Sequence, residues 1–458
     1  MAVSRKGQID MTIGHIMKNI ILFAIPIIIG NVLQQLYTTV DALVIGQYCG
    51  DTSLAAVGTS SQPVEVLLCV FLGIGTGVSI LISQYAVAKE SDKVVSICGT
   101  SITFIYIIGI PVGILGWFAA PYILEFMKVP QDVWDAALIY TRLVFLGTLG
   151  NLGYNMNAGI LRVLGDSKAS LWFLVVSCIS NIVFDLVFVA GFGMDVAGAA
   201  LATSIAMFIS WLVSIVYIKK MFPEIQFTFL PRRFSGKMMK DILAIGLPVG
   251  LNNSLYSLGH VALQTFNNSQ GAVFMAGGAV AGRITGCSNI AITGLSSAAT
   301  TFSGQNYGAK KYDRIKEGHW KIPICSGLIT LGCGLFFIMI HKSLIRFFSS
   351  DEMVLMYASR HVVVMLLSQW FYAIFNCIIS IVNGTGRVRY TTIVNILMLW
   401  AVRIPSAYII NRYFDGTWVM LCFPISFSFG MFAMIGYYLF SPAWKEVMRL
   451  AENKPQDY

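Results

Sequence analysis

Three polar residues inside apolar stretches are the side chains of this sequence best suited to chemistry. Asp41 lies in the apolar run that includes QQLYTTVDALVIGQYCG (residues 34–50). Asn181 and Asp185 lie four residues apart in SNIVFDLVF (180–188), so a helix places them on one face. A carboxylate in the middle of a membrane costs about 2.5 to 3.5 kcal/mol on insertion scales, and such a residue is normally turned inward and used. We therefore take both acids as candidates for ion coupling.

Two further side chains could add oxygen atoms to the same site. Thr203 carries a hydroxyl in GAALATSIAM, and Tyr140 carries a phenol near the start of another apolar segment. With Asn181 and the two carboxylates they would offer oxygen ligands to a small hard cation such as Na⁺. Two carboxylates in one apolar environment could also exchange protons near neutral pH. Taken alone, Thr203 is more simply read as a helix-packing hydrogen bond.

The elements that position these residues must be membrane-spanning helices. Of the 458 residues 56% are hydrophobic and 12% are charged, whereas a soluble domain carries about a quarter charged residues. Apolar windows of about 20 residues, each long enough to cross a bilayer, recur along the chain. The sequence predicts an all-α polytopic membrane protein with about twelve spans, at 17–45, 58–87, 96–125, 133–158, 168–191, 196–219, 241–268, 273–305, 317–342, 353–384, 390–412 and 418–441.

The net charge of +9 is distributed as in a membrane protein rather than a nucleic-acid-binding one. Most Lys and Arg residues fall in the tails and in alternate loops, which predicts that both termini are cytoplasmic, in the inner (plasma) membrane of a cell. Anionic lipid is the partner that this charge implies. The nine cysteines form no CxxC pair, so we expect no zinc site, no disulfide framework and no cofactor.

The two halves of the chain resemble each other. SQYAVAKESDKV (83–94) aligns with GQNYGAKKYDRI (304–315), and at nearly the same separation Pro26 aligns with Pro248. About six spans separate the copies, so both halves enter the membrane in the same direction, as a parallel repeat. We therefore predict an N-terminal six-helix lobe (1–218), a basic cytoplasmic linker (219–240), a C-terminal six-helix lobe (241–442) and a cytoplasmic tail (443–458).

The predicted ion site is asymmetric between the lobes, because the second lobe has no acid at the aligned positions. Asp41 aligns with Leu263, Asn181 with Val402 and Asp185 with Ser406. Pro26 and Pro248 each interrupt the first helix of a lobe and permit a bend. Because Pro26 precedes Asp41 on one helix, ion binding at the acid could change that bend.

Other polar residues in the spans have weaker assignments. Gln34, Tyr37 and Asn155 are predicted to line a substrate cavity, to which the second lobe would add His260 and Asn376. Such a wall, with aromatic and Met side chains, suits flat lipophilic cations. The arginines within or near spans are expected to snorkel or to pair structurally; they are Arg283, Arg360 and Arg403.

The chain resembles the bacterial multidrug and toxic compound extrusion (MATE) transporters, in the branch of the DNA-damage-inducible exporters. The resemblance covers nearly the whole chain and is carried by PIIIGNVLQQLYTTVDALVIGQYCGDTSLAAVG (26–58), LRVLGD (161–166), SNIVFD (180–185) and SGQNYGAKK (303–311). It implies two six-helix bundles, alternating access and cation-coupled export of organic cations. It also implies roles for residues that match the family pattern: a cation or proton site at Asp41, Asn181, Asp185 and Thr203, with Tyr140 beside it. Another branch has acids in the seventh and tenth helices, where this chain has His260 and Asn376.

Two other functions fit the sequence less well. A flippase for lipid-linked sugars or polysaccharide precursors would need several inward cationic groups to hold pyrophosphate, whereas the first lobe offers acids. A membrane-embedded enzyme would need a catalytic motif, and the sequence has no HExxH and no Ser/His nucleophile arrangement. The expected activity is therefore transport, not catalysis.

Overall fold

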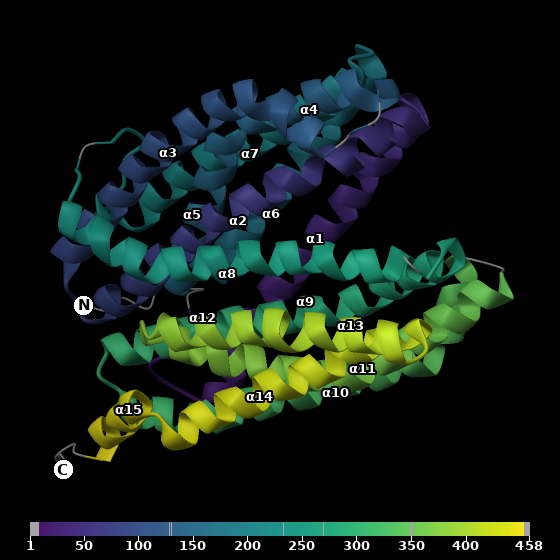
Figure 1. The fold of residues 1–458 in the computed structure, drawn as a ribbon. Coiled ribbons are helices and arrows are strands. Elements are labelled where there is room, and N and C mark those ends of the chain that lie inside the picture. Colours follow the sequence, from purple (N-terminus) through teal and green to yellow (C-terminus); the bar gives the residue numbers. More distant parts are fainter. Residues whose placement is uncertain are drawn as a thin grey trace. The chain divides into compact units, whose positions relative to one another are not determined.

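The computed structural model is helical throughout the residues it describes, which are 9–127, 129, 131–231, 233–268, 270–348 and 351–452 (Figure 1). No strand occurs among them. The elements in chain order are α1 (Ile16–Tyr48), α2 (Asp51–Val87), α3 (Ser91–Phe126), η1 (Gln131–Val133), α4 (Trp134–Leu146), α5 (Thr148–Val163), α6 (Ser167–Asp185), η2 (Leu186–Gly191), α7 (Asp195–Met221), η3 (Pro223–Ile225), α8 (Gly236–Asn268), α9 (Ala272–Gly308), α10 (Tyr312–Phe348), α11 (Glu352–Gly384), α12 (Val388–Ile396), η4 (Leu397–Arg403), α13 (Ile404–Tyr413), η5 (Gly416–Leu421), α14 (Cys422–Phe440) and α15 (Pro442–Glu452).

The predicted all-α membrane fold is confirmed. Within the described residues nine helices are long and apolar enough to cross a membrane, or ten if α4 and α5, which meet at a bend of 49°, form one span. Helices α8 and α9 have 33 and 37 residues and match the two remaining predicted spans. They are as long as the others, although α8 includes Asn252 and Asn253 and α9 contains several glycines. Each predicted span thus corresponds to one helix or to one interrupted helix.

Packing divides the chain into two compact units, and the division falls inside two helices. Unit 1 comprises Met1–Ile9 and Ile29–Asn253, and unit 2 comprises Asp10–Ile28 and Ser254–Tyr458. The first part of α1 therefore belongs to unit 2, and the first part of α8 belongs to unit 1. The lobes predicted from the repeat, with their boundary at the basic linker 219–240, remain a division by sequence.

Glycines allow α2 and α8 to cross closely inside unit 1. A Cβ atom on Gly77 would lie 2.8 Å from the backbone nitrogen of Gly246, and one on Gly73 would collide with the backbone of Gly250. Close approach through small residues is a common way for helices to associate in a membrane. The main apolar core of unit 1 accordingly includes Ile242, from the first part of α8.

In unit 2 the segment before α1 is held by the SGQNYGAKK motif. The backbone N–H of Met11 donates to Gln305 Oε1 (3.0 Å), and Asn306 Nδ2 donates to the carbonyl of Met11 (3.0 Å). Lys311 Nζ donates to the carbonyl of Thr12 (2.8 Å). The motif that helped to identify the repeat therefore anchors a peptide segment by its backbone.

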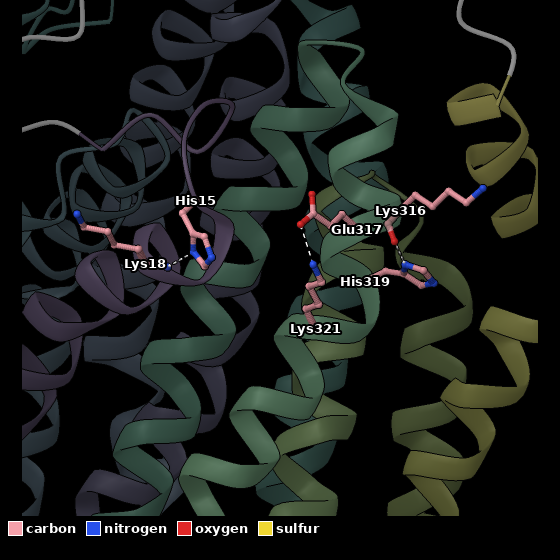
Figure 2. A network of polar contacts seen from close by, with 6 residues as sticks. All are labelled: His15, Lys18, Lys316, Glu317, His319 and Lys321. Carbon is pink, nitrogen blue, oxygen red and sulfur yellow. Dashed lines mark hydrogen bonds and ion pairs between the residues drawn. The ribbon is translucent and has the colours of Figure 1, made fainter.

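Figure 2 shows polar contacts at the starts of α1 and α10, both in unit 2. The backbone N–H of Lys18 donates to His15 Nδ1 (3.4 Å) at the start of α1. One turn apart on α10, Lys321 Nζ donates to Glu317 Oε1 (2.8 Å). These charged groups are exposed and belong to the polar ends of the helices.

The last helix, α15, lies against α10 and α14 in the same unit. Trp444 and Val447 are fully buried, and the Trp444 ring stacks on Tyr438 with centroids 4.7 Å apart. At the far end of α15, Glu452 pairs with Lys316 of α10 (2.6 Å). The predicted tail therefore begins with a packed helix.

Candidate functional site

Helices α1 and α6 bring two carboxyl groups together in unit 1. Asp41 and Asp185 lie close enough to interact electrostatically; Asp185 is fully buried and Asp41 is partly buried. Two neighbouring ionised carboxylates repel each other, and a proton or a cation bound between them relieves that repulsion. The pair is therefore arranged to hold one positive charge, as a proton or as a bound cation.

The buried carboxyl oxygens of this pair have no hydrogen-bond donors among the described residues. No described residue donates a hydrogen bond to the buried Oδ1 of Asp41 or to either oxygen of Asp185. The buried Oδ1 of Asn181, one turn before Asp185, also has no donor among the described residues. Buried polar atoms are normally paired, because an unpaired one costs about 1 to 3 kcal/mol. An oxygen-seeking ion at this point would satisfy all of them.

Thr203 orients the amide of Asn181. Asn181 Nδ2 on α6 donates to Thr203 Oγ1 on α7 at 3.1 Å. This contact is the helix-packing hydrogen bond expected for an isolated threonine. It also fixes which end of the amide is used, because with the nitrogen engaged the oxygen is the free atom.

Two tyrosines interact with the acids. Tyr140 on α4 and Tyr37 on α1 are both close enough to Asp41 and Asp185 to interact with them electrostatically. Tyr37 lies one helical turn before Asp41, so the two side chains share a face of α1. Tyr37 was predicted only as part of the cavity wall, and the structure places it beside the acids.

A π-helix begins immediately after the buried acid. Asp185 ends α6, and the chain continues as η2 through Gly191. Single π-helical turns occur frequently at functional sites, where they redirect side chains. The sequence predicted one regular span over 168–191, and nothing in the apolar pattern marks the change.

Sequence reasoning missed two neighbours of this group. Tyr154, buried on α5, and Cys178, buried on α6, both interact electrostatically with Tyr37. Cys178 lies seven residues before Asp185, or about two helical turns, so it faces the same side of α6. That spacing was the signal available in the sequence for including it.

The other predicted residues lie outside this cluster of contacts. Gln34 is exposed on α1, and Asn155 on α5 is partly buried and donates to the carbonyl (2.9 Å) and Oδ1 (3.0 Å) of Asn151. His260 and Asn376 belong to unit 2. The His260 ring packs against Tyr256, with centroids 4.7 Å apart, and Asn376 Nδ2 donates to the carbonyl of Tyr372 (3.1 Å).

The two predicted bending points lie within continuous helices. Both α1 and α8 pass their prolines, Pro26 and Pro248, without a break. The change of unit follows soon after each proline, at Ile28 in α1 and at Asn253 in α8. Bending at the prolines remains a prediction.

Arg403 was expected to snorkel or to pair structurally, and it does not snorkel. Its side chain is fully buried in unit 2 and forms no ion pair with a described acid. It donates instead to Ser426 Oγ (2.9 Å) and Tyr256 Oη (3.4 Å). Snorkelling fails here because the residue lies in the middle of the span formed by α12, η4 and α13, well away from either end.

Comparisons with known proteins agree with this architecture. The MatE family model matches residues 26–187 and again 248–409, so each half of the chain carries one copy and each match begins at a proline. The predicted internal repeat is thereby confirmed.

Proteins named as probable multidrug resistance proteins match this chain over most of their lengths. The chain is 29% identical over 450 residues to the probable multidrug resistance protein YoeA of Bacillus subtilis, covering 94% of this chain and 95% of the relative. It is 25% identical to the probable multidrug resistance protein NorM of Thermotoga maritima, covering 90% of each. A crystal structure of MATE in complex with MaD3S superposes with a TM-score of 0.87 at 23% identity, covering 98% of this chain and 100% of that one. The outward-facing conformation of a multidrug resistance MATE family transporter of the MOP superfamily superposes with a TM-score of 0.85 at 23% identity, covering 98% of this chain and 99% of that one.

Proposed function

Because the chain belongs to the MatE family of multidrug efflux transporters, we propose that it is a secondary active antiporter that exports organic cations in exchange for H⁺ or Na⁺. The observation that carries this proposal is the buried Asp185 beside Asp41, with oxygen atoms that have no other hydrogen-bond donor among the described residues. A buried carboxyl pair without a cationic partner is suited to bind and release a small cation.

In the proposed cycle, the outward-facing protein takes up H⁺ or Na⁺ at the two acids. For Na⁺ the ligands are Asp41, Asp185, the free oxygen of Asn181 and the Thr203 hydroxyl; for H⁺ the two carboxyls suffice. Tyr140 and Tyr37 adjoin the site as phenol donors. Loading removes the repulsion between two ionised carboxylates, so it favours a tighter arrangement of α1 against α6.

The coupling to drug release runs along α1. This helix carries Pro26 in unit 2 and Asp41 in unit 1. A change at Asp41 is therefore transmitted to the other unit through a single helix, and the missing N–H of Pro26 makes a bend there less costly. We propose that this bend displaces the drug. The protein then returns to the conformation in which its cavity opens to the cytoplasm.

The drug is held by uncharged and aromatic side chains, for which Gln34, Tyr37, Asn155, His260 and Asn376 remain the candidates. Flat lipophilic cations bind such surfaces through dispersion and cation–π contacts that tolerate many shapes. The proposed location is the inner (plasma) membrane with both termini in the cytoplasm. Labelling of single introduced cysteines at the two termini from outside intact cells tests that orientation, which external labelling of either end would contradict.

Ethidium accumulation in cells that lack their major exporters tests the proposed function. At matched membrane levels, we expect wild-type protein to lower accumulation and Asp41→Asn to leave it at the level of the empty vector. Asp92→Asn, which neutralises an exposed acid at the start of α3, is the matched control and should export normally. Export by Asp41→Asn at the wild-type rate would contradict the coupling role. Proteoliposomes with an imposed proton or sodium gradient then identify the ion.

A further inference from the structure

Arg403 is a buried charge in unit 2 that the proposed transport cycle does not use. It is the last residue of the π-helix η4, and Pro405 follows two residues later. Proline has no N–H to donate into the preceding turn, which disturbs the regular helix at this point. The guanidinium is fixed by its hydrogen bonds to Ser426 (2.9 Å) and Tyr256 (3.4 Å). Its position is therefore set by three separate helices, α8, η4 and α14.

No described carboxylate balances this charge. The acids of unit 2 lie at or near the helix ends, in α15 or in the segment before α1, and none pairs with Arg403; they are Asp10, Asp313, Glu317, Asp351, Glu352, Asp415, Glu446 and Glu452. Groups that interact with Arg403 electrostatically are His260, Tyr372 and Cys422. None of these types is normally an anion at neutral pH. A buried charge without an opposite charge is costly, so an anion is favoured beside it.

The aromatic rings around the guanidinium determine how an anion can approach. Its central carbon lies 4.9 Å from the Phe423 ring centre, 5.0 Å from that of Phe427 and 5.6 Å from that of Tyr256. These rings lie beside the guanidinium and partly offset its charge through cation–π attraction, whereas its N–H groups point outward in the plane of the group. An anion must then approach in the plane, at an edge.

The free edge has the geometry of a carboxylate receptor. Arginine has five N–H groups; Nε and one N–H of Nη1 are engaged by Ser426 and Tyr256. Nη2 is buried and has no acceptor among the described residues. Both N–H groups of Nη2 and one of Nη1 therefore remain for a ligand, and a carboxylate, with two oxygens in one plane, is the anion that suits a guanidinium.

We propose that Arg403 anchors a second binding site, in unit 2, which takes the carboxylate of a small aromatic molecule. The aromatic part of the ligand packs among the rings near the guanidinium. Here the Tyr256 ring lies against His260, and the ring centres of Tyr372 and Phe427 are 4.6 Å apart. Tyr256 and Tyr372 are only partly buried and His260 is exposed, so we propose that the ligand enters past these three side chains. This site goes beyond the proposed export of cations, because it selects a negative group.

Binding of 2-naphthoate to the purified full-length protein in detergent, measured by equilibrium dialysis, tests the proposal without any gradient. We expect saturable binding to wild type and a loss of affinity of about tenfold or more in Arg403→Gln, since hydrogen bonds to a charged group are removed. Arg403→Lys should be weaker than wild type, because ammonium lacks the planar fork. Arg360→Gln removes an arginine that also lies over a ring, that of Trp418, and should bind as wild type does.

Ligand controls separate the anion from the ring. The neutral 2-naphthalenemethanol should not compete, and acetate should compete weakly. Equal binding by wild type and Arg403→Gln, competition by the neutral alcohol, or competition by chloride as strong as by acetate would each overturn the proposal. Because the assay needs no transport, its failure is distinct from failure of ethidium export.

Thermal unfolding distinguishes a variant that has lost the binding site from one that is misfolded. Naphthoate should raise the melting temperature of wild type and leave that of Arg403→Gln unchanged. If Arg403→Gln does not fold, Ser426→Ala and Tyr256→Phe serve in its place. Each keeps the Arg403 charge but removes one hydrogen bond that orients the guanidinium, and both should weaken naphthoate binding severalfold. Full affinity in both of these variants would contradict the receptor geometry.

Discussion

Asp185 is a buried acid without a cationic partner among the described residues. It is fully buried, neither of its oxygens has a hydrogen-bond donor there, and the neighbouring Asp41 is another acid. Replacing an unpaired buried charge by an isosteric neutral group is often neutral or stabilising. We therefore expect Asp185→Asn to abolish ethidium export while its melting temperature equals or exceeds that of wild type. Export with a lowered melting temperature would show that the residue is structural.

The site residues that could be predicted from the sequence were those whose type is rare in a membrane. A carboxylate in an apolar run is conspicuous, so Asp41 and Asp185 were identified without any structure. Tyr154 and Cys178 were missed, because a tyrosine or cysteine in a span is ordinary and only the fold brings it to the acids. The choice between snorkelling and structural pairing for Arg403 stayed open for a related reason: hydropathy gives its depth along a span but not whether its side chain points outward or into the core.

At the scale of helices, the crossing of α2 and α8 depends on glycine. A Cβ atom on Gly73 would collide with Gly250 backbone, which no side-chain rotation relieves. Overpacking of this kind costs about 1 to 3 kcal/mol. Gly73→Ala should accordingly lower the melting temperature, whereas Gly278→Ala in α9, whose added methyl would meet nothing within 4 Å, should not. Equal melting temperatures in the two variants would contradict the close crossing.

The attachment of α15 depends on its apolar face rather than on its ion pair. Truncating the fully buried Trp444 removes its stacking on Tyr438, and losses for such residues are about 3 to 5 kcal/mol. The Lys316 ammonium holds the pKa of Glu452 below its usual value, but both groups are exposed and contribute little. Limited proteolysis should release the C-terminal residues from Trp444→Ala and spare Glu452→Gln. Rapid cleavage of both would assign the attachment to the ion pair.

The regular helices could be predicted from the sequence, but their interruptions could not. Hydropathy windows located each span because crossing a bilayer demands about 20 apolar residues. The bend between α4 and α5 and the π-helices η2 and η4 keep the same apolar composition as the helices around them. Each π-helix adjoins a buried ionisable residue, Asp185 or Arg403. The irregular backbone thus lies where each unit buries an ionisable group, and π-turns commonly occur at functional sites.

At the scale of the whole molecule, the sequence repeat predicted two lobes. In the structure the first part of α1 packs in unit 2 and the first part of α8 packs in unit 1, so the two units exchange these segments. The exchange could not be seen in the sequence, since hydropathy reports that a helix spans a membrane and not what it packs against. Two sets of contacts document it. Met11 and Thr12 are bound by Gln305, Asn306 and Lys311 in unit 2, and Gly246 of α8 packs on Gly77 in unit 1.

This exchange predicts how a divided chain behaves. A cut within the linker 219–240, ahead of α8, leaves the first fragment without the part of α8 that packs on α2. It leaves the second fragment without residues 10–28, whose backbone satisfies the polar side chains of the SGQNYGAKK motif. Each fragment alone would expose a close-packed glycine surface or unpaired buried polar groups, both unfavourable in a membrane. We expect neither fragment to accumulate as a monodisperse protein by itself and both to co-purify, with ethidium export restored, when produced together. A first fragment that is stable alone would mean that the lobes fold separately and that α8 adds nothing to unit 1.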